Sequence, residues 1–423
     1  MNTMLKHRLM VGILSMLCAQ ICWGNIISED QKLVGQSVSS LDEFGRNIAV
    51  TNGGTRLLAG APFDGSNDGS AYVFENNNTS WSETQRLISS DNATGDFFGA
   101  AVALQNNVAV VSATGDSNLQ GAAYVFRFNG QSWVEEAKLT ASDAEDGAQF
   151  GSSMKLEGDY LVIGAQSCCT NSQIGSAYVF EFDGLDWVEI AKLTASNGTP
   201  ANRFGATIDI KNGLVVIGAP RSFSSRGAAY VFEEFGSSWN QLQGITPLDP
   251  VNNKQFGSSV TWGNDDRLLI GAANDNSIAT RNGAVYVFER NAQTNRGGLV
   301  WSQDDKLVAS DAASDNFFGG FNQGISVDGD FMVVTALEDR EVVAEGGAAY
   351  LFKFINNNWI ELEKFTASDL GASWFFGRSV IIQNNTILVG ASGANTSRGA
   401  VYSFTNDLIF EDNFDTGTAS PER

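Results

Sequence analysis

A phenylalanine-glycine pair occurs seven times along this chain, and the surroundings of the pair are similar each time. The pairs are Phe44-Gly45, Phe98-Gly99, Phe150-Gly151, Phe204-Gly205, Phe256-Gly257, Phe318-Gly319 and Phe376-Gly377. Successive pairs are 54, 52, 54, 52, 62 and 58 residues apart. Such a repeat is too long for a two-helix or leucine-rich unit and suits a small sheet of four strands. Seven such units predict a closed ring.

Each repeat contains the pattern of four strands. In the third repeat, Phe150 opens an apolar run that ends at the tight turn 157–159, and a second run follows at 160–165. Two apolar runs around a short turn predict a hairpin. The third strand is Gly175–Phe180, and its pattern returns in every repeat. The fourth begins at a tryptophan, which is followed five residues later by Arg86, Lys138, Lys192, Lys306 or Lys364, with Gly244 as the exception.

The second and third strands are apolar at nearly every position, not at alternate ones. This pattern is expected when both faces of a sheet are covered. Sheets stacked around an axis provide that cover. The sequence therefore predicts an all-β fold, a seven-bladed β-propeller of four-stranded antiparallel blades.

Only six of these outer-strand tryptophans are present, so one outer strand is missing from the C-terminal end. The stretch 29–34 matches residues 137–140 of the second repeat, which belong to its fourth strand. We expect residues 28–35 to complete the last blade, whose other strands come from 376–404, because pairing the two ends leaves no open sheet edge. The alternative is that residues 408–410 form this strand.

The two ends of the chain differ in composition from the repeats. Residues 1–24 combine basic residues, an apolar stretch and a small residue at position 24, the pattern of a secretory signal peptide. No other segment has the ~20 apolar residues that span a bilayer. We expect a propeller over 25–405, a flexible acidic tail over 406–423, and a secreted product in the extracellular space, the periplasm or at the cell surface.

The charge and the histidine content exclude several functions. Residues 1–24 contain Lys6 and Arg8 and no acidic residue, so 24 basic and 48 acidic residues remain after them. This excess of negative charge makes nucleic acid an unsuitable partner. The single histidine, His7, lies in the predicted signal peptide. Without histidine there is no Ser-His-Asp triad and no histidine-ligated zinc, and we expect no enzymatic activity.

Two cysteines follow one another after the second strand of the third repeat. Cys168 and Cys169 are the only cysteines outside the predicted signal peptide. In an oxidising compartment they form a disulfide between neighbours, or stay as thiols that pair with another molecule. Both alternatives remain open.

These motifs resemble the FG-GAP repeat proteins, whose repeats build the seven-bladed propeller at the head of integrin α chains. The resemblance covers residues 28–404, with Gly-Ala-Pro itself at 60–62 and 218–220. The chain looks most like exported bacterial members, for which the resemblance implies a fold and a binding or adhesive role. The family's calcium ligands do not carry over, because hairpin turns such as 157–159 are too short and too poor in acids.

A different loop has the spacing of a cation site. Asp64, Ser66 and Asp68 alternate before Gly69, as oxygen ligands of hard cations do. We expect calcium as a candidate ligand here, with a hydrated Asx-rich turn as the alternative. Glu75 falls at a suitable register, but a strand over 72–74 would carry it away.

Acidic residues precede most Phe-Gly pairs, and the clearest are Asp91, Asp96, Asp143, Asp146, Asp311, Asp315 and Asp369. Because a side chain needed in every repeat is a structural one, we expect these acids to cap backbone amides of their own turns. Cation binding around one rim is the alternative.

In a propeller, the loops between strands two and three (2-3 loops) and between consecutive blades (4-1 loops) share one face, the default binding surface. Five arginines stand in or beside its 2-3 loops: Arg221, Arg226, Arg281, Arg340 and Arg398. They could hold a carboxylate or sulfate, or form salt bridges with nearby acids.

The leading hypothesis is a monomeric, non-enzymatic exported propeller that binds protein or carbohydrate through this face, in adhesion or recognition. One alternative is a glycan-active enzyme that uses paired carboxylates. The other is a structural surface protein that associates with itself.

Overall fold

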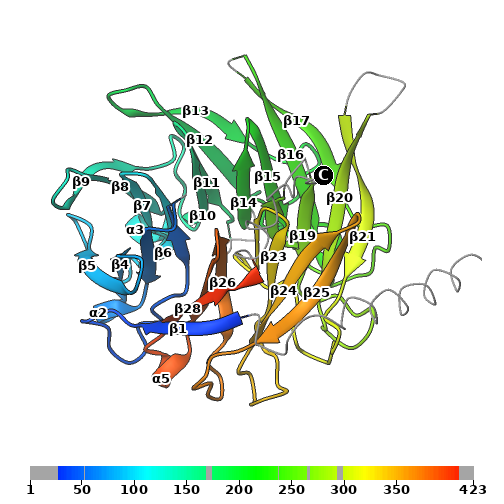
Figure 1. Ribbon diagram of the computed structural model, residues 1–423. Coiled ribbons are helices and arrows are strands. Elements are labelled where there is room, and N and C mark those ends of the chain that lie inside the picture. The colour runs from blue at the N-terminus through cyan, green and yellow to red at the C-terminus, as the bar shows by residue number, and fades with distance from the viewer. Residues whose placement is uncertain are drawn as a thin grey trace, which may run out of the picture.

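Seven four-stranded antiparallel sheets surround a common axis in the computed structural model of this protein (Figure 1). The structure describes residues 27–51, 53–167, 174–236, 238–263, 267–292 and 299–408. The expected all-β fold and the number of blades are confirmed. The predicted signal peptide, both cysteines of the third repeat and residues 409–423 of the predicted tail lie outside the described residues.

The strands of each blade follow one another from the axis outward. Blade 1 is β2 (Ile48–Val50), β3 (Arg56–Ala61), β4 (Ser70–Asn76) and β5 (Trp81–Leu87). Blade 2 is β6 (Phe98–Gln105), β7 (Val108–Ala113), β8 (Ala122–Phe128) and β9 (Trp133–Leu139). Blade 3 is β10 (Phe150–Glu157), β11 (Tyr160–Ala165), β12 (Ser176–Phe182) and β13 (Trp187–Leu193). Blade 4 is β14 (Thr207–Lys211), β15 (Leu214–Ala219), β16 (Ala228–Phe235) and β17 (Ser238–Ile245).

The remaining blades repeat this order, except that the last takes its outer strand from the other end of the chain. Blade 5 is β18 (Phe256–Trp262), β19 (Leu268–Ala272), β20 (Ala284–Ala292) and β21 (Leu299–Leu307). Blade 6 is β22 (Ile325–Asp328), β23 (Phe331–Ala336), β24 (Ala348–Ile355) and β25 (Asn358–Phe365). Blade 7 is β26 (Phe376–Gln383), β27 (Thr386–Ala391), β28 (Ala400–Asn406) and β1 (Ile27–Leu33).

The N-terminal strand closes the ring, as expected. β1 pairs antiparallel with β28, with Leu33 opposite Val401 and Ile27 opposite Asn406, and the two strands lie side by side in Figure 1. β1 therefore occupies the edge that the alternative assigned to residues 408–410. Leu408 instead packs, partly buried, against the core between blades 6 and 7.

The two glycine motifs recur because they meet between neighbouring blades. Gly69, at the start of the third-strand motif of blade 1, forms a parallel bridge with Phe98 of blade 2. Its φ is +86°, and a Cβ there would lie 2.1 Å from the carbonyl oxygen of Phe98. Only glycine permits both this conformation and this approach. The spacing between the motifs is thus set by contact between consecutive blades.

The aromatic residues of the motifs form the core. Phe98 is fully buried, and its ring centroid lies 5.6 Å from that of Tyr124 and 6.1 Å from that of Phe126, both edge-on. Equivalent edge-on or tilted pairs occur in the other blades. Such geometry adds to the stabilisation from apolar burial.

Four of the 2-3 loops contain a short four-residue turn: α2 (Asp64–Asn67), α3 (Asp116–Leu119), α4 (Ser222–Ser225) and α5 (Ala394–Ser397). In α3, Ser117, Asn118 and Leu119 all have positive φ, a conformation that costs non-glycine residues energy. Backbone carbonyls of Asn118 and Leu119 accept hydrogen bonds from the amides of Gly147 and Gln149 in the next 4-1 loop. These bonds hold the two kinds of loop together.

No helix in the described part of the chain is long and apolar enough to cross a membrane.

Candidate ligand-binding site

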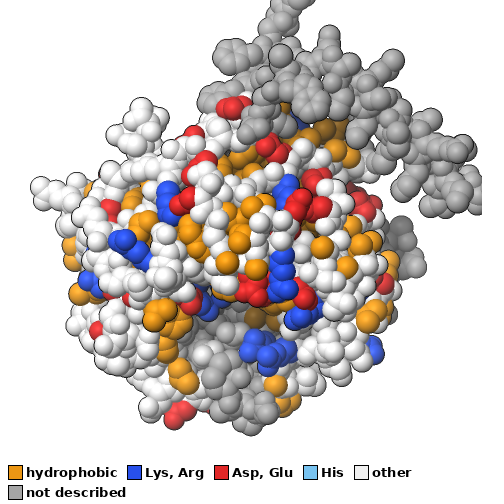
Figure 2. All heavy atoms as spheres, turned by 90° about the horizontal axis from the view of Figure 1, so that it is seen from below, with side chains coloured by type: hydrophobic (Ala, Val, Ile, Leu, Met, Phe, Trp, Pro, Cys, Tyr) orange, Lys and Arg blue, Asp and Glu red, His pale blue; other side chains and the backbone are white. Residues whose placement is uncertain are grey.

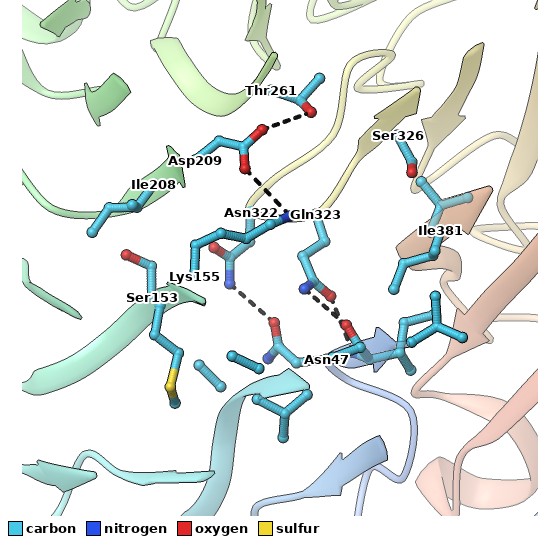
Figure 3. Close-up of a pocket in the computed structure, with 18 of the residues that line it drawn as sticks. Asn47, Ser153, Lys155, Ile208, Asp209, Thr261, Asn322, Gln323, Ser326 and Ile381 are labelled. Carbon is cyan, nitrogen blue, oxygen red and sulfur yellow. Dashed lines mark hydrogen bonds and ion pairs between the residues drawn. The ribbon is translucent and has the colours of Figure 1, made fainter. Parts of the chain in front are cut away.

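The first strands of the seven blades line an axial channel. An inner cavity of about 250 Å³ lies within it, between apolar side chains such as Met154, Ile208 and Val260. Asp209 is the acidic side chain in this described lining, and it accepts a hydrogen bond from the amide of Trp262 at 2.8 Å. It also contacts Thr261 at 3.1 Å and Lys155 at 3.3 Å (Figure 3). The charges inside the channel are therefore paired with each other.

A short insertion in blade 6 crosses the channel. Seven positions separate Phe318 from Ile325, whereas four separate Phe256 from Val260, its counterpart in blade 5. We call residues 320–324 the septum. Figure 3 shows Asn322 and Gln323 of the septum in the middle of the ring of labelled channel residues. Sequence reasoning noted the longer step but did not identify this insertion.

The septum is fixed to three blades. Both Gln323 side-chain polar atoms bind the backbone of Ile48 in blade 1, at 3.0 Å each. The Gln323 carbonyl accepts from Val380 of blade 7 at 3.0 Å, and the Asn322 amide donates to Ser258 of blade 5 at 2.7 Å. The septum is thus a rigid partition and not a loose loop.

A second hollow lies on the other side of the septum. This mouth hollow has a volume of about 440 Å³, and Phe321 and Asn322 form part of its lining. Thr114 and Gln166 at the start of 2-3 loops, and Gln149 at the end of a 4-1 loop, also line it. The mouth hollow therefore opens on the face where 2-3 and 4-1 loops meet, and the septum contributes to its inner wall.

Four arginines line the mouth hollow in two pairs, and its described lining contains no Asp, Glu, His or Cys. Arg46 and Arg378 belong to the adjacent blades 1 and 7, whereas Arg203 and Arg221 both belong to blade 4. In a ring of seven, blade 4 is opposite the junction of blades 7 and 1. The two arginine pairs therefore face each other across the channel mouth.

Burial and mutual repulsion disfavour the charged form of two of these arginines. Burial, with the nearby charge of Arg46, lowers the pKa of Arg378 to about 10. Burial and the charge of Arg221 likewise lower the pKa of Arg203, and its buried Nε has no hydrogen-bond partner. Arg46 is paired with Glu43, but no ion pair within the described chain neutralises Arg203, Arg221 or Arg378.

The five predicted arginines have different surroundings. Arg281 pairs with Asp315 at 2.7 Å, and Arg340 reaches Glu338 and Glu345 at 3.3 Å each. For these two residues the salt-bridge alternative applies. Arg226 binds Asn252 at 2.8 Å, and the Nε of Arg398 is buried without a partner. Among the five, only Arg221 lines the mouth hollow.

Sequence reasoning missed the other three arginines of the hollow. A signal was present, because Arg46 and Arg378 directly follow a Phe-Gly pair and Arg203 directly precedes one. After the pair, the other repeats have a small residue: Ala100, Ser152, Ala206, Ser258 or Gly320. These departures from the repeat are informative only once the fold places them around one opening.

The predicted calcium loop forms α2, where Asp64 already has partners. Its Oδ2 lies 2.7 Å from the Tyr72 hydroxyl and 2.8 Å from Arg86, whereas the Oδ1 of Asp68 is buried without a partner. Glu75 lies in β4 and pairs with Arg56 at 2.9 Å. Within the described ranges, no group of three or more His, Cys, Asp or Glu side chains is arranged to hold a metal ion. Calcium binding by Asp64, Ser66 and Asp68 stays a prediction.

Four of the acids before the Phe-Gly pairs bind the hydroxyl of the third-strand tyrosine, a contact that the expected capping of their own turns did not include: Asp91, Asp143, Asp311 and Asp369. In blade 2, the hydroxyl of Tyr124 is 2.7 Å from Asp91 and 2.9 Å from Asp116. Lys138 binds the same two acids at 2.7 and 2.5 Å. Burial alone would raise the pKa of Asp91, but the bonds from Lys138 and Tyr124 outweigh it and lower the pKa. Asp96 caps the amide of Ala93, as predicted.

The cluster is neutral in blade 4, where the basic residue is missing. Tyr230 lies 2.8 Å from Asn197, which takes the position of Asp91, and Gly244 takes that of Lys138. Ser222 precedes Tyr230 by eight residues, as Asp116 precedes Tyr124. Blade 4 therefore lacks both acidic residues of the cluster and also its basic residue. This joint absence supports a structural role for the clusters, because buried charges require partners.

A family model of the FG-GAP repeat matches the chain seven times, over residues 27–74, 81–126, 133–180, 187–232, 239–288, 301–352 and 359–404. The chain belongs to the FG-GAP repeat family. Each matched repeat from the second onward begins at an outer strand and ends in the third strand of the next blade. The first starts with β1, so the FG-GAP repeats are offset by one strand from the blades, as closure by the N-terminal strand requires.

Other comparisons concern the fold alone. No curated protein matches the chain. Among solved structures, a chain of Kuenenia stuttgartiensis hydrazine synthase is similar with a TM-score of 0.56 and 11% sequence identity. The match covers 87% of the FG-GAP protein and 97% of that chain. At this identity, the likeness supports the propeller architecture and carries no statement about activity.

Proposed function

We propose that this FG-GAP protein is an exported, non-enzymatic binding protein that takes a protein or carbohydrate ligand on the face of the 2-3 and 4-1 loops. The mouth hollow carries this proposal. Its volume of about 440 Å³ lies within the range of about 300–1,000 Å³ that is usual for ligand pockets. The septum at its inner side makes it a pocket instead of an open pore.

The loops around the hollow support a binding role because they are held in place before any ligand arrives. Hydrogen bonds link the α3 turn to the loop at Gly147 and Gln149, and those of α4 and α5 link to the next loops in the same way. A preorganised surface loses little conformational entropy on binding. The described lining has neither histidine nor a carboxylate, so it lacks the groups that acid-base catalysis would need.

A binding screen tests the proposal. Residues 25–423 would be applied to an array of glycans and cell-surface proteins, with and without calcium, and we expect ligands that bind at the mouth hollow. Thr114→Trp, which fills the hollow, should abolish the binding that the unchanged protein shows. Gln131→Trp, on an exposed hairpin at the opposite end of the same blade, is the matched control. Equal binding by both variants would contradict the assignment of the face.

Two further measurements address the remaining predictions. Calorimetry with calcium on the unchanged protein and on Asp64→Ala/Asp68→Ala tests the α2 loop, and heat in the former alone would support a site there. Sedimentation across a range of concentrations tests the expected monomer against a self-associating surface protein.

A further inference from the structure

We propose that the mouth hollow selects ligands with two anionic groups, carboxylates or sulfates, one for each arginine pair. This inference rests on the proposed function and names the chemistry of the ligand. The protein has an excess of acidic residues, yet the described lining of the hollow contains four arginines and no acid.

The state of the guanidinium groups argues against a structural role. On the same face, Arg281 and Arg340 have carboxylate partners within 3.3 Å. Arg203, Arg221 and Arg378 have no such partner among the described residues, and burial and a neighbouring arginine lower the pKa of Arg203 and Arg378. A partly buried, unpaired cation beside a second cation destabilises a fold. An external anion would supply the missing partner.

The arrangement of the pairs indicates two anionic groups. Arg46 and Arg378 lie close enough for their charges to interact, as do Arg203 and Arg221. The pairs come from opposite sides of the ring, with the septum residues Phe321 and Asn322 among the hollow's lining. Guanidinium groups bind carboxylate and sulfate oxygens in a bidentate manner. A ligand with an anionic group near each end would engage both pairs.

The neutral part of the lining suits a polyhydroxylated ligand between the anionic groups. Gln149, Gln166, Gln255 and Asn322 supply amide donors and acceptors around the hollow. An acidic oligosaccharide offers hydroxyls to such amides and anionic groups to the arginines. We therefore commit to an acidic glycan as the ligand class. A peptide with two acidic side chains is an alternative outcome of the test.

Calorimetry tests the proposal with a disulfated disaccharide, its monosulfated and unsulfated forms, a diuronate disaccharide and a peptide with two acidic residues. We expect the doubly anionic sugars to bind at least about tenfold more tightly than the unsulfated form, since charge-assisted hydrogen bonds are the strong ones. Affinity should fall as salt rises. A comparison of the affinities for the disulfated and the diuronate disaccharide shows whether the hollow prefers sulfate or carboxylate groups.

Paired variants locate the contact. Arg46→Gln/Arg378→Gln and Arg203→Gln/Arg221→Gln should each lower the affinity for the doubly anionic sugar by about tenfold or more. Arg281→Gln/Arg340→Gln, on the same face but already paired with acids, should change it less than about twofold. Equal losses in all three double variants would overturn the proposal. So would tight binding of the unsulfated sugar, or preference for the peptide.

Thermal unfolding without ligand provides a readout that a structural role would not give. Arg378→Gln should raise the melting temperature, because it removes an unpaired charge near Arg46; a lower melting temperature would contradict the proposal.

If the array finds a neutral ligand at the hollow, the proposed function stands and this inference fails. If Thr114→Trp leaves all binding unchanged, the proposed function itself fails.

Discussion

Lys32 Nζ lies 2.7 Å from Asp369 Oδ2, although the two residues are 337 positions apart in the chain. Tyr402 completes this cluster, with its hydroxyl 2.8 Å from Asp369. The arrangement is that of Lys138, Asp91 and Tyr124 in blade 2. In blade 7, a structural unit of the repeat is thus assembled from both ends of the chain.

Removal of residues 25–35 should destabilise the whole ring. It takes away β1 with the buried Ile27 and Leu33 and exposes the edge of β28. Burial of two such side chains contributes about 3 kcal/mol or more, so thermal unfolding should begin at a clearly lower temperature. Removal of residues 409–423 is the control. Unfolding of the N-terminal truncation at an unchanged temperature would disprove closure by β1.

Asp275 should be the most sensitive acid of the clusters. Its side chain is fully buried and lies 3.0 Å from Lys254, 2.9 Å from Lys306 and 2.8 Å from the Tyr286 hydroxyl. Asp275→Asn should reduce the free energy of unfolding at pH 7 by about 3 kcal/mol, because it leaves the buried Lys254 and the half-buried Lys306 to share the one carboxylate of Asp249. Denaturant unfolding measures the loss. Asp186→Asn, at an exposed turn, should be neutral.

The same carboxylate predicts a pH dependence. Burial raises the pKa of Asp275, but hydrogen bonds from Ser277 and the two lysines outweigh it, so the folded pKa lies below the ordinary 3.8. A depressed acid pKa contributes stability above the unfolded value and loses it as pH falls further. The protein should lose stability below about pH 4, and Asp275→Asn should show a shallower loss. Parallel pH profiles would contradict this assignment.

Blade 4 permits a test of charge compensation. Asn197→Asp would place a carboxylate beside Tyr230 without the base that other blades have, and we expect a loss of about 1–2 kcal/mol. Adding Gly244→Lys should restore most of it, because a Cβ at Gly244 would approach no atom more closely than the ring of Tyr230, at 3.3 Å. A double-mutant cycle measures the coupling. If the changes in the free energy of unfolding caused by the two single substitutions simply add in the double variant, charge compensation is contradicted.

The septum should be fixed mainly by one side chain. Gln323→Ala removes both hydrogen bonds to the backbone of Ile48, and we expect a loss of about 1–3 kcal/mol, since a buried backbone group is left without a partner. Gln105→Ala, which also lines the inner cavity, is the control. Hydrogen exchange at the Ile48 amide should become faster only in Gln323→Ala, and unchanged protection there would contradict the role given to the Gln323 side chain.

The repeat made much of this fold predictable. A phenylalanine at the position of Phe98 and a glycine at the position of Gly69 recur in every blade because the two meet at each junction between neighbouring blades. The same contact is therefore encoded seven times in the sequence. The missing outer tryptophan strand and the match of residues 29–34 to other fourth strands then predicted the closure. The Asp-Lys-Tyr clusters were visible as recurring residue types, but their mutual contacts were not.

The sequence by itself determined the number of blades, their strand order and the closure by an N-terminal strand, predicted over 28–35 and found over 27–33, because these depend on local patterns that repeat. Only the tertiary structure decided the site. Arg46 and Arg378 are adjacent because the ring closes, and Arg203 faces them because blade 4 lies opposite. Whether an arginine finds a carboxylate depends on side chains from other loops. The ion pair of Arg281 with Asp315, and the lack of a carboxylate partner for Arg203 among the described residues, are therefore properties of the folded ring.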